Sequence, residues 1–248
     1  MRVLLLGGTG EARALAARLH PKLEVISSLA GRVPDPALPV GRVRIGGFGG
    51  VQGLRNWLVD NGITAVVDAT HPFAAGITGN AAAACAELGV AHLVLHRPPW
   101  DPAGCLEADS EDTAAEHVAE QGHSRVFLTT GRSGIAPFRH SAAWFLIRVV
   151  TAREAADLPR NHQIVLSRGP YRYDEERSLI DRHGIEALVT KNSGGAMTRA
   201  KILAAQDLGV DVVMIRRPAL PAGVRAVGTV EDAQAWVREV LSRDSGAG

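Results

Sequence analysis

A chain of 248 residues with 46% hydrophobic and 21% charged residues has the composition of an ordinary globular protein. Its formal net charge of +1 argues against a general nucleic-acid or membrane-surface binder, so any positive field must be local. No segment approaches the ~20 apolar residues of a membrane span, and the apolar start at residues 1–6 is too short for a signal peptide. We therefore expect a cytoplasmic protein.

Short apolar runs alternate with helical patterns along the chain, which predicts repeated βα units and parallel sheets. In the first half we expect, in chain order, strand 2–6, helix 11–19, strands 23–28 and 43–45, helix 51–61, strand 65–68, helix 77–88 and strand 92–95. Three prolines then fall in five residues, at 98–102, and they cannot continue a helix or a central strand. This segment is the predicted linker.

The second half repeats the alternation. The expected elements are helix 111–120, strand 125–130, a short helix 133–138, strands 144–149 and 163–167, helix 175–183, strand 186–190, helix 198–208, strand 212–215 and helix 230–241. Capping boxes at Thr151…Glu154 and Thr229…Asp232 indicate helix starts. The pattern favours two Rossmann-like, doubly wound α/β domains, at residues 1–97 and 98–248.

Five apolar runs share a basic residue where the strand should stop. These residues are Arg97, Arg132, Arg168, Lys191 and Arg216. Because ligands of open α/β sheets bind outside the carboxyl ends of the strands, such residues would surround one crevice. Guanidinium and ammonium groups there would attract a ligand with several carboxylates or phosphates. The alternative is that arginine is abundant here and strand ends are commonly polar.

The first turn, residues 7–12, is rich in glycine, follows a strand and opens a helix. Glycines let the backbone approach a pyrophosphate, and the helix N-terminus supplies amides for it. Counting Gly8 and Gly10 as the first two glycines of a dinucleotide fingerprint puts Arg13 where the third should be. The turn therefore favours dinucleotide binding without completing the motif, and glycine here also serves packing.

The end of the second strand bears on the choice of cofactor. An Asp or Glu there typically binds the ribose of NAD, whereas basic or small polar groups accommodate the 2′-phosphate of NADP. This strand ends in Ser27 and Ser28 and continues to Gly31 and Arg32, without a carboxylate. The pattern favours NADPH over NADH.

His71 follows the fourth strand within the segment Asp-Ala-Thr-His-Pro-Phe, which begins at Asp68. It could orient a nicotinamide or give a proton, since histidine titrates near working pH, or it could only cap the strand end. No histidines show metal-ligand spacing, Cys85 and Cys105 form no CxxC pair, and we expect no bound metal. Neither tyrosine, Tyr171 or Tyr173, has the lysine four residues on that short-chain dehydrogenases need.

The segment Thr-Lys-Asn-Ser-Gly-Gly at residues 190–195 precedes a helix. Successive amides in such a turn can form an anion nest, to which the helix dipole adds. Two of the three lysines, Lys191 and Lys201, fall in or just after it, so we favour an anion site over a merely flexible turn.

Taken together, five blocks resemble the precorrin-6A reductase family of cobalamin (vitamin B12) biosynthesis. They are Gly-Gly-Thr-Gly-Glu-Ala at 7–12, Asp-Ala-Thr-His-Pro-Phe-Ala at 68–74, Thr-Gly-Arg at 130–132, Ser-Arg-Gly-Pro at 167–170 and Thr-Lys-Asn-Ser-Gly-Gly at 190–195. The resemblance implies two Rossmann-like domains that exchange their last strands. It implies NADPH-dependent reduction of one double bond of precorrin-6A to give precorrin-6B.

The resemblance also implies a division of roles between the domains. The first would bind NADPH, and the second would bind the polycarboxylate tetrapyrrole, with His71 as a tentative catalytic residue. The implied cofactor-binding residues are Gly8, Thr9, Gly10, Glu11, Ser28, Gly31, Arg32 and Thr70. The implied substrate-binding residues are Arg97, Arg132, Arg168, Lys191, Asn192, Ser193, Arg199, Lys201 and Arg216. Neighbouring pathway enzymes are the expected protein partners.

Two other functions stay open on the residues alone. One is an NADPH-dependent reductase or epimerase of another small polyanion, and the other is a non-catalytic NADPH sensor. Both predict cofactor binding, but neither requires a basic rim.

Overall fold

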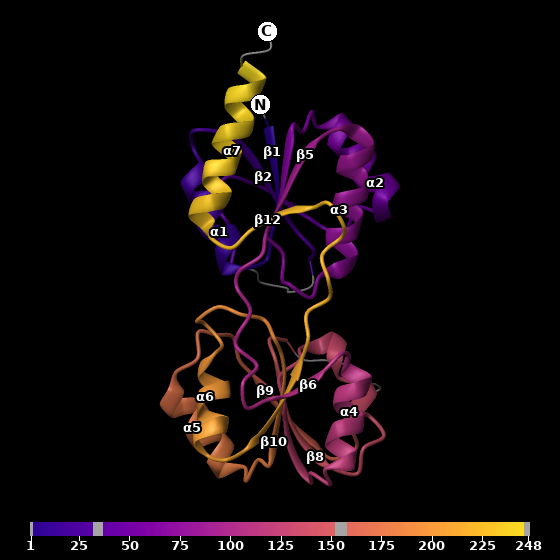
Figure 1. Ribbon diagram of the computed structural model, residues 1–248, viewed down its shortest axis with the longest axis vertical. Coiled ribbons are helices and arrows are strands. Elements are labelled where there is room, and N and C mark those ends of the chain that lie inside the picture. The colour runs from indigo at the N-terminus through magenta and orange to yellow at the C-terminus, as the bar shows by residue number, and fades with distance from the viewer. Residues whose placement is uncertain (1, 32–36, 152–157, 246–248) are drawn as a thin grey trace. The chain divides into compact units, whose positions relative to one another are not determined.

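The computed structural model describes residues 2–31, 37–151 and 158–245, and it divides the chain into two compact units (Figure 1). The first unit comprises Met1–Pro98 and Pro218–Gly248, and the second comprises Pro99–Arg217. The chain leaves the first unit at the predicted proline linker. It also returns to that unit at Pro218. Residues 218–248 were predicted to belong to the second domain, but they belong to the first unit.

The first unit contains a parallel sheet of six strands in the order β12-β5-β4-β1-β2-β3. The strands are β1 (Arg2–Leu6), β2 (Glu24–Leu29), β3 (Arg42–Ile45), β4 (Ala65–Asp68), β5 (Ala91–Leu95) and β12 (Arg225–Val227). Helices α1 (Gly10–Leu19) and α7 (Val230–Ser245) cover one face, and α2 (Gly50–Asp60) and α3 (Ala75–Leu88) cover the other (Figure 1). The strands alternate buried side chains between these two helix layers, so both faces of the sheet are core.

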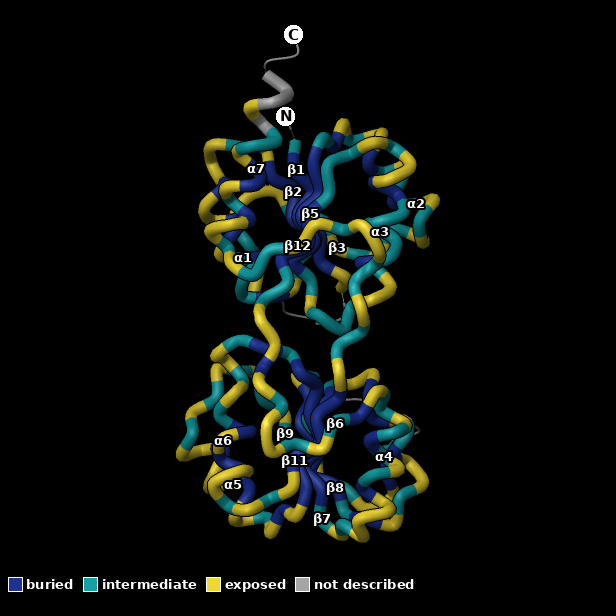
Figure 2. Tube along the Cα trace, viewed as in Figure 1, coloured by how far each residue is buried: buried dark blue, intermediate teal, exposed yellow. Residues whose placement is uncertain are grey.

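The second unit repeats this arrangement with the strand order β6-β11-β10-β7-β8-β9, again all parallel. The strands are β6 (Leu106–Ala108), β7 (Arg125–Leu128), β8 (Trp144–Val149), β9 (His162–Leu166), β10 (Ala187–Lys191) and β11 (Asp211–Ile215). The helices are α4 (Glu111–Glu120), α5 (Tyr173–Arg182) and α6 (Ala200–Asp207), with two short 3-10 turns, η1 (Arg132–Gly134) and η2 (Ala136–Phe138). In both units the central strands are the most deeply buried segments (Figure 2).

The two sheets exchange their edge strands. β6 follows β5 along the chain but pairs with β11 in the second sheet, with Ala108 in register with Ile215. β12, near the end of the chain, pairs with β5 in the first sheet, with Val227 in register with Leu95. The exchange that the resemblance implied is therefore present, and it is the reason why the last 31 residues group with the first unit.

The predicted strands and helices are found with shifts of a few residues at their ends, and the last helix reaches Ser245. The Thr229 hydroxyl accepts from the Asp232 amide at 3.1 Å and so caps α7, whereas Glu154 of the other capping box lies outside the described residues. β6 and β12, which are three residues each, were not predicted from the sequence. Among the described residues, none of the helices is both long and apolar enough to span a bilayer.

Candidate functional site

The turn between β1 and α1 brings the backbone of the first unit close to the end of β2. The Gly7 amide donates to the Ser28 carbonyl at 2.9 Å, and a Cβ on Gly7 would lie 3.3 Å from the Ala12 side chain. Gly8 has a φ of 117°, a value that only glycine adopts readily. Thr9 caps α1: its hydroxyl accepts from the Ala12 amide at 3.1 Å and donates to the Ala69 carbonyl at 2.7 Å. The predicted glycine turn is thus a tight strand-to-helix turn, tied to the end of β4.

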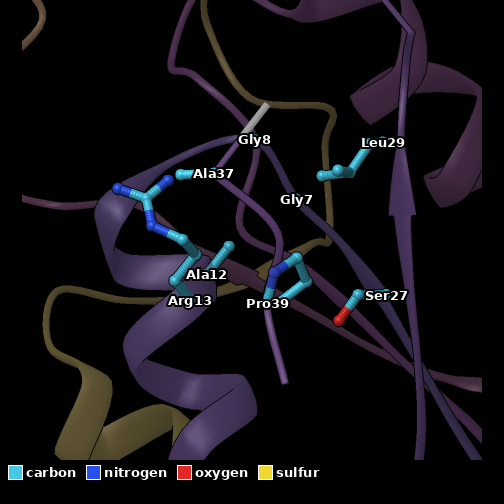
Figure 3. A pocket seen from close by; sticks show the side chains of 8 residues that line it. All are labelled: Gly7, Gly8, Ala12, Arg13, Ser27, Leu29, Ala37 and Pro39. Atoms are coloured by element: carbon cyan, nitrogen blue, oxygen red, sulfur yellow. The ribbon is translucent and has the colours of Figure 1, made fainter. Parts of the chain in front are cut away.

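A pocket opens beside this turn (Figure 3). Its lining residues are Gly7, Gly8, Ala12, Arg13, Ser27, Leu29, Ala37 and Pro39. Arg13, which occupies the third-glycine position of the fingerprint, extends along one wall toward Ala37 (Figure 3). Helix amides, a glycine turn and an arginine together suit a phosphate-bearing ligand.

The side chains at the end of β2 divide between the two faces of the sheet. Ser27 and Leu29 face the pocket, whereas the Ser28 hydroxyl accepts from Arg44 Nη1 at 3.2 Å. Arg44, at the end of β3, also donates to the Gly46 and Gly47 carbonyls, and its guanidinium lies 3.7 Å from the centre of the Phe48 ring. Burial lowers the pKa of Arg44. Of the predicted ribose-binding residues, Gly31 has a φ of 72° and Arg32 lies outside the described residues.

The end of β4 is organised by the buried carboxylate of Asp68. One of its oxygens accepts from the Thr70 amide at 3.0 Å and the Thr70 hydroxyl at 2.6 Å, and the other accepts from the Thr78 hydroxyl at 2.6 Å. The Thr70 hydroxyl therefore uses its proton within the protein, which leaves only its oxygen lone pairs for a cofactor.

His71 is exposed, and its Nδ1 accepts from the Phe73 amide at 3.3 Å. A neutral ring that accepts this bond carries its proton on Nε2.

Glu11 and Arg97 form an ion pair at 2.8 Å within the first unit. The sequence analysis assigned Glu11 to the cofactor and Arg97 to the substrate. The structure pairs them with each other; the other strand-end cations belong to the second unit.

In the second unit four predicted cations lie at the carboxyl edge of the sheet, because its strands are all parallel. They are Arg132, Arg168, Lys191 and Arg216, which lie at or just after the ends of β7, β9, β10 and β11. Arg216 is exposed and pairs with Asp109 at 2.7 Å and with Glu107 at 3.2 Å. Lys191 is buried and its Nζ lies 2.8 Å from Glu111 Oε1.

Glu111 begins α4, and its pKa reflects opposed effects. Burial acts to raise the pKa, but the hydrogen bond and charge of Lys191, together with a backbone hydrogen bond, outweigh it and lower the pKa. The carboxylate is therefore held in its charged form beside the ammonium.

Asn192 and Lys201 hold the linker and the glycine loop together. The Asn192 side chain accepts from the Trp100 amide at 2.8 Å and donates to the Trp100 carbonyl at 3.0 Å. Lys201 Nζ donates to the Thr198 carbonyl at 2.9 Å and lies 5.0 Å from the Trp100 ring. Both side chains are buried, so in this structure they support the loop. Ser193 and the exposed Arg199 complete the predicted set in this loop.

A buried pair that the sequence analysis did not single out lies beside them. Arg148 of β8 donates to both carboxylate oxygens of Glu176 in α5, at 2.8 and 2.7 Å. The Tyr171 ring lies 4.1 Å from the Arg148 guanidinium carbon. No local pattern could have identified this pair, because its partners are 28 residues apart and each sits in an otherwise ordinary strand or helix.

Comparison with known proteins gives one consistent result. The family model described as "Precorrin-6x reductase CbiJ/CobK" matches residues 2–238. A precorrin-6A reductase of Mycobacterium tuberculosis is 65% identical over 98% of this chain and 99% of its own length, and one of Rhodococcus erythropolis is 50% identical over 98% and 99%. A solved structure of a CobK precorrin-6A reductase superposes with a TM-score of 0.88 at 38% identity, covering 97% of each chain. A cobalt-precorrin-6A reductase of Priestia megaterium is 29% identical over 89% and 92%.

Proposed function

Since this chain belongs to the precorrin-6x reductase CbiJ/CobK family, we propose that it reduces one double bond of precorrin-6A, with NADPH as reductant, to give precorrin-6B in cobalamin biosynthesis. The family match over residues 2–238 is the observation that carries the proposal. The relatives at 65% and 50% identity are named for the substrate without cobalt, so we assign the cobalt-free macrocycle.

The first unit is assigned to NADPH. The tight glycine turn, the amides of α1 and the pocket lined by Arg13 and Ser27 fit a dinucleotide whose phosphates lie at the turn. Bound NADPH would supply the hydride to one ring carbon, while a proton goes to the neighbouring carbon and NADP⁺ is left.

The second unit is assigned to the tetrapyrrole. Arg216 and Arg168 follow β11 and β9, which are four strand spacings apart in the sheet. At ~4.8 Å per spacing the strand ends are about 19 Å apart, too far for one small anion to bridge. A macrocycle with carboxylates around its rim can engage cations at both ends of such an edge. This width supports the tetrapyrrole over a smaller polyanion.

The protein's part in the chemistry would be mostly positioning. The carboxyl edge of the second sheet binds the substrate carboxylates, with Lys191 held in place by Glu111. The β1–α1 turn binds the dinucleotide. His71 is the candidate proton donor, and water or a substrate carboxyl group is the alternative.

The proposal is tested by mixing the purified chain with NADPH and precorrin-6A and following the nicotinamide absorbance. Substrate-dependent oxidation, with precorrin-6B as product, is the expected result. Cofactor binding without oxidation would instead favour the NADPH sensor. Oxidation with another polyanion but not with precorrin-6A would favour the rival reductase.

A further inference from the structure

Ser27 is a buried polar residue beside the turn between β1 and α1. It lies near the carboxyl end of β2, the strand between β1 and the edge strand β3, and is only 1% exposed. Its hydroxyl has no hydrogen-bond partner among the described residues. Because an unsatisfied buried hydroxyl costs free energy, such a group calls for a ligand or another explanation.

The Ser27 side chain lines the pocket beside the β1–α1 turn (Figure 3). Side chains alternate along a strand, so Ser27 and Leu29 share the face toward α1 while Ser28 points to the opposite face and bonds Arg44. The hydroxyl at the end of β2 that meets the pocket is therefore that of Ser27, not that of Ser28.

Arg13 supplies the charge in the same pocket. It is half-buried, and within the described residues its guanidinium has no hydrogen-bond or ion-pair partner. It stands in the first turns of α1, where the helix dipole disfavours a cation. A cation in that position with no carboxylate partner among the described residues suits an anion site.

We propose that Arg13 and Ser27 bind the 2′-phosphate of NADPH and thereby set the preference for NADPH over NADH. The inference rests on the proposed function and assigns to it the residues that select the cofactor. In dinucleotide-binding folds the ribose 2′ position is read at the end of the second strand, beside the turn that holds the pyrophosphate. Ser27 lies two residues before that end and Arg13 just beyond the turn, and both line the same pocket, so one phosphate between them would meet a hydroxyl donor and a guanidinium.

The experiment measures dissociation constants of the full-length chain for NADP⁺, NAD⁺, 2′,5′-ADP and 5′-ADP by calorimetry. Arg13→Gln should weaken the binding of NADP⁺ and 2′,5′-ADP by about 10- to 100-fold, because it removes a charge-assisted contact. The dissociation constants of NAD⁺ and 5′-ADP should change by less than about threefold. Arg18→Gln is the matched control: Arg18 is on the same helix but pairs with Glu231, and its substitution should change no affinity.

The Ser27→Ala variant tests whether the Ser27 hydroxyl contacts the ligand or only supports the fold. Because the hydroxyl has no partner among the described residues, alanine should leave the melting temperature of the free protein unchanged or higher. The same variant should weaken the binding of NADP⁺ several-fold. Ser28→Ala should leave the ratio of the affinities for NADP⁺ and NAD⁺ unchanged.

Three other outcomes would overturn the inference. An equal loss of affinity for NADP⁺ and NAD⁺ in Arg13→Gln would mean that Arg13 binds the pyrophosphate. A preference for NADP⁺ that survives in both variants would overturn it too, and would leave the proposed function standing. A wild-type chain that binds neither dinucleotide would remove both.

Discussion

Lys191 Nζ lies 2.8 Å from Glu111 Oε1, so the ammonium that ends β10 is held by the carboxylate that begins α4. The two residues are 80 positions apart, and they meet because β10 and α4 both present these ends at the carboxyl edge of the second sheet. A paired, buried ammonium has a fixed position, which is what recognition of a particular substrate carboxylate requires.

Lys191→Ala should weaken binding of the tetrapyrrole by more than ~1 kcal/mol, or about fivefold, because a charged contact is lost. The affinity for NADP⁺ should not change. Fluorescence or calorimetric titration with each ligand checks both values, and Arg182→Ala, on the exposed end of α5, is the control. Equal losses for the two ligands would undo the assignment of one ligand to each unit.

Glu176→Gln should destabilise the protein by about 3–5 kcal/mol, because Arg148 would keep its charge in a buried site without a carboxylate. Arg148 is 7% and Glu176 2% exposed, so water cannot replace the partner. Replacing both residues with apolar ones, as in Arg148→Met with Glu176→Leu, should recover much of the loss. Urea unfolding of the wild type and the two variants measures this; a double variant no more stable than Glu176→Gln would contradict it.

Lys201 should make the stability of the protein rise with pH. Burial lowers the pKa of Lys201 to about 7, whereas the unfolded chain has the usual value near ~10.4. Between these two values the unfolded state binds more protons than the folded state, so raising the pH favours folding by up to ~1.4 kcal/mol per pH unit.

Lys201→Met removes this group, so the stability of wild type relative to Lys201→Met should increase between pH 7 and 9. The urea midpoint at each pH is the measurement, and the exposed Lys22→Met serves as control. A difference that stays constant with pH would show that Lys201 keeps its ordinary pKa.

The central strands and the amphipathic helices could be predicted because burial on both faces demands apolar runs of a recognisable period. The two exchanged edge strands, β6 and β12, could not. β6 reads Leu-Glu-Ala and β12 reads Arg-Ala-Val, each too short and too polar to stand out from a loop. Which sheet an edge strand joins depends on the path of the chain between units, so the return of residues 218–248 to the first unit has no local signature.

The side chains of the candidate site could also be predicted from the sequence only in part. The glycine turn was identified because its backbone geometry requires glycine. The choice of Ser28 over Ser27 was made without the register of β2, and it is this register that turns Ser27 toward the pocket. The partners of Arg97 and Lys191 are 86 and 80 residues away along the chain, and only the folded structure brings them together.

His71→Asn should lower kcat for precorrin-6A reduction by about 100-fold if His71 gives the proton, since general acid catalysis is typically worth that much or more. The KM for NADPH should stay within about threefold, because the hydrogen bond from the Phe73 amide to Nδ1 can be made by the asparagine oxygen. Steady-state kinetics measures both constants, with the exposed His140→Asn as control. An unchanged kcat would assign the proton to water or to a substrate carboxyl group and would leave His71 with a purely structural role at the end of β4.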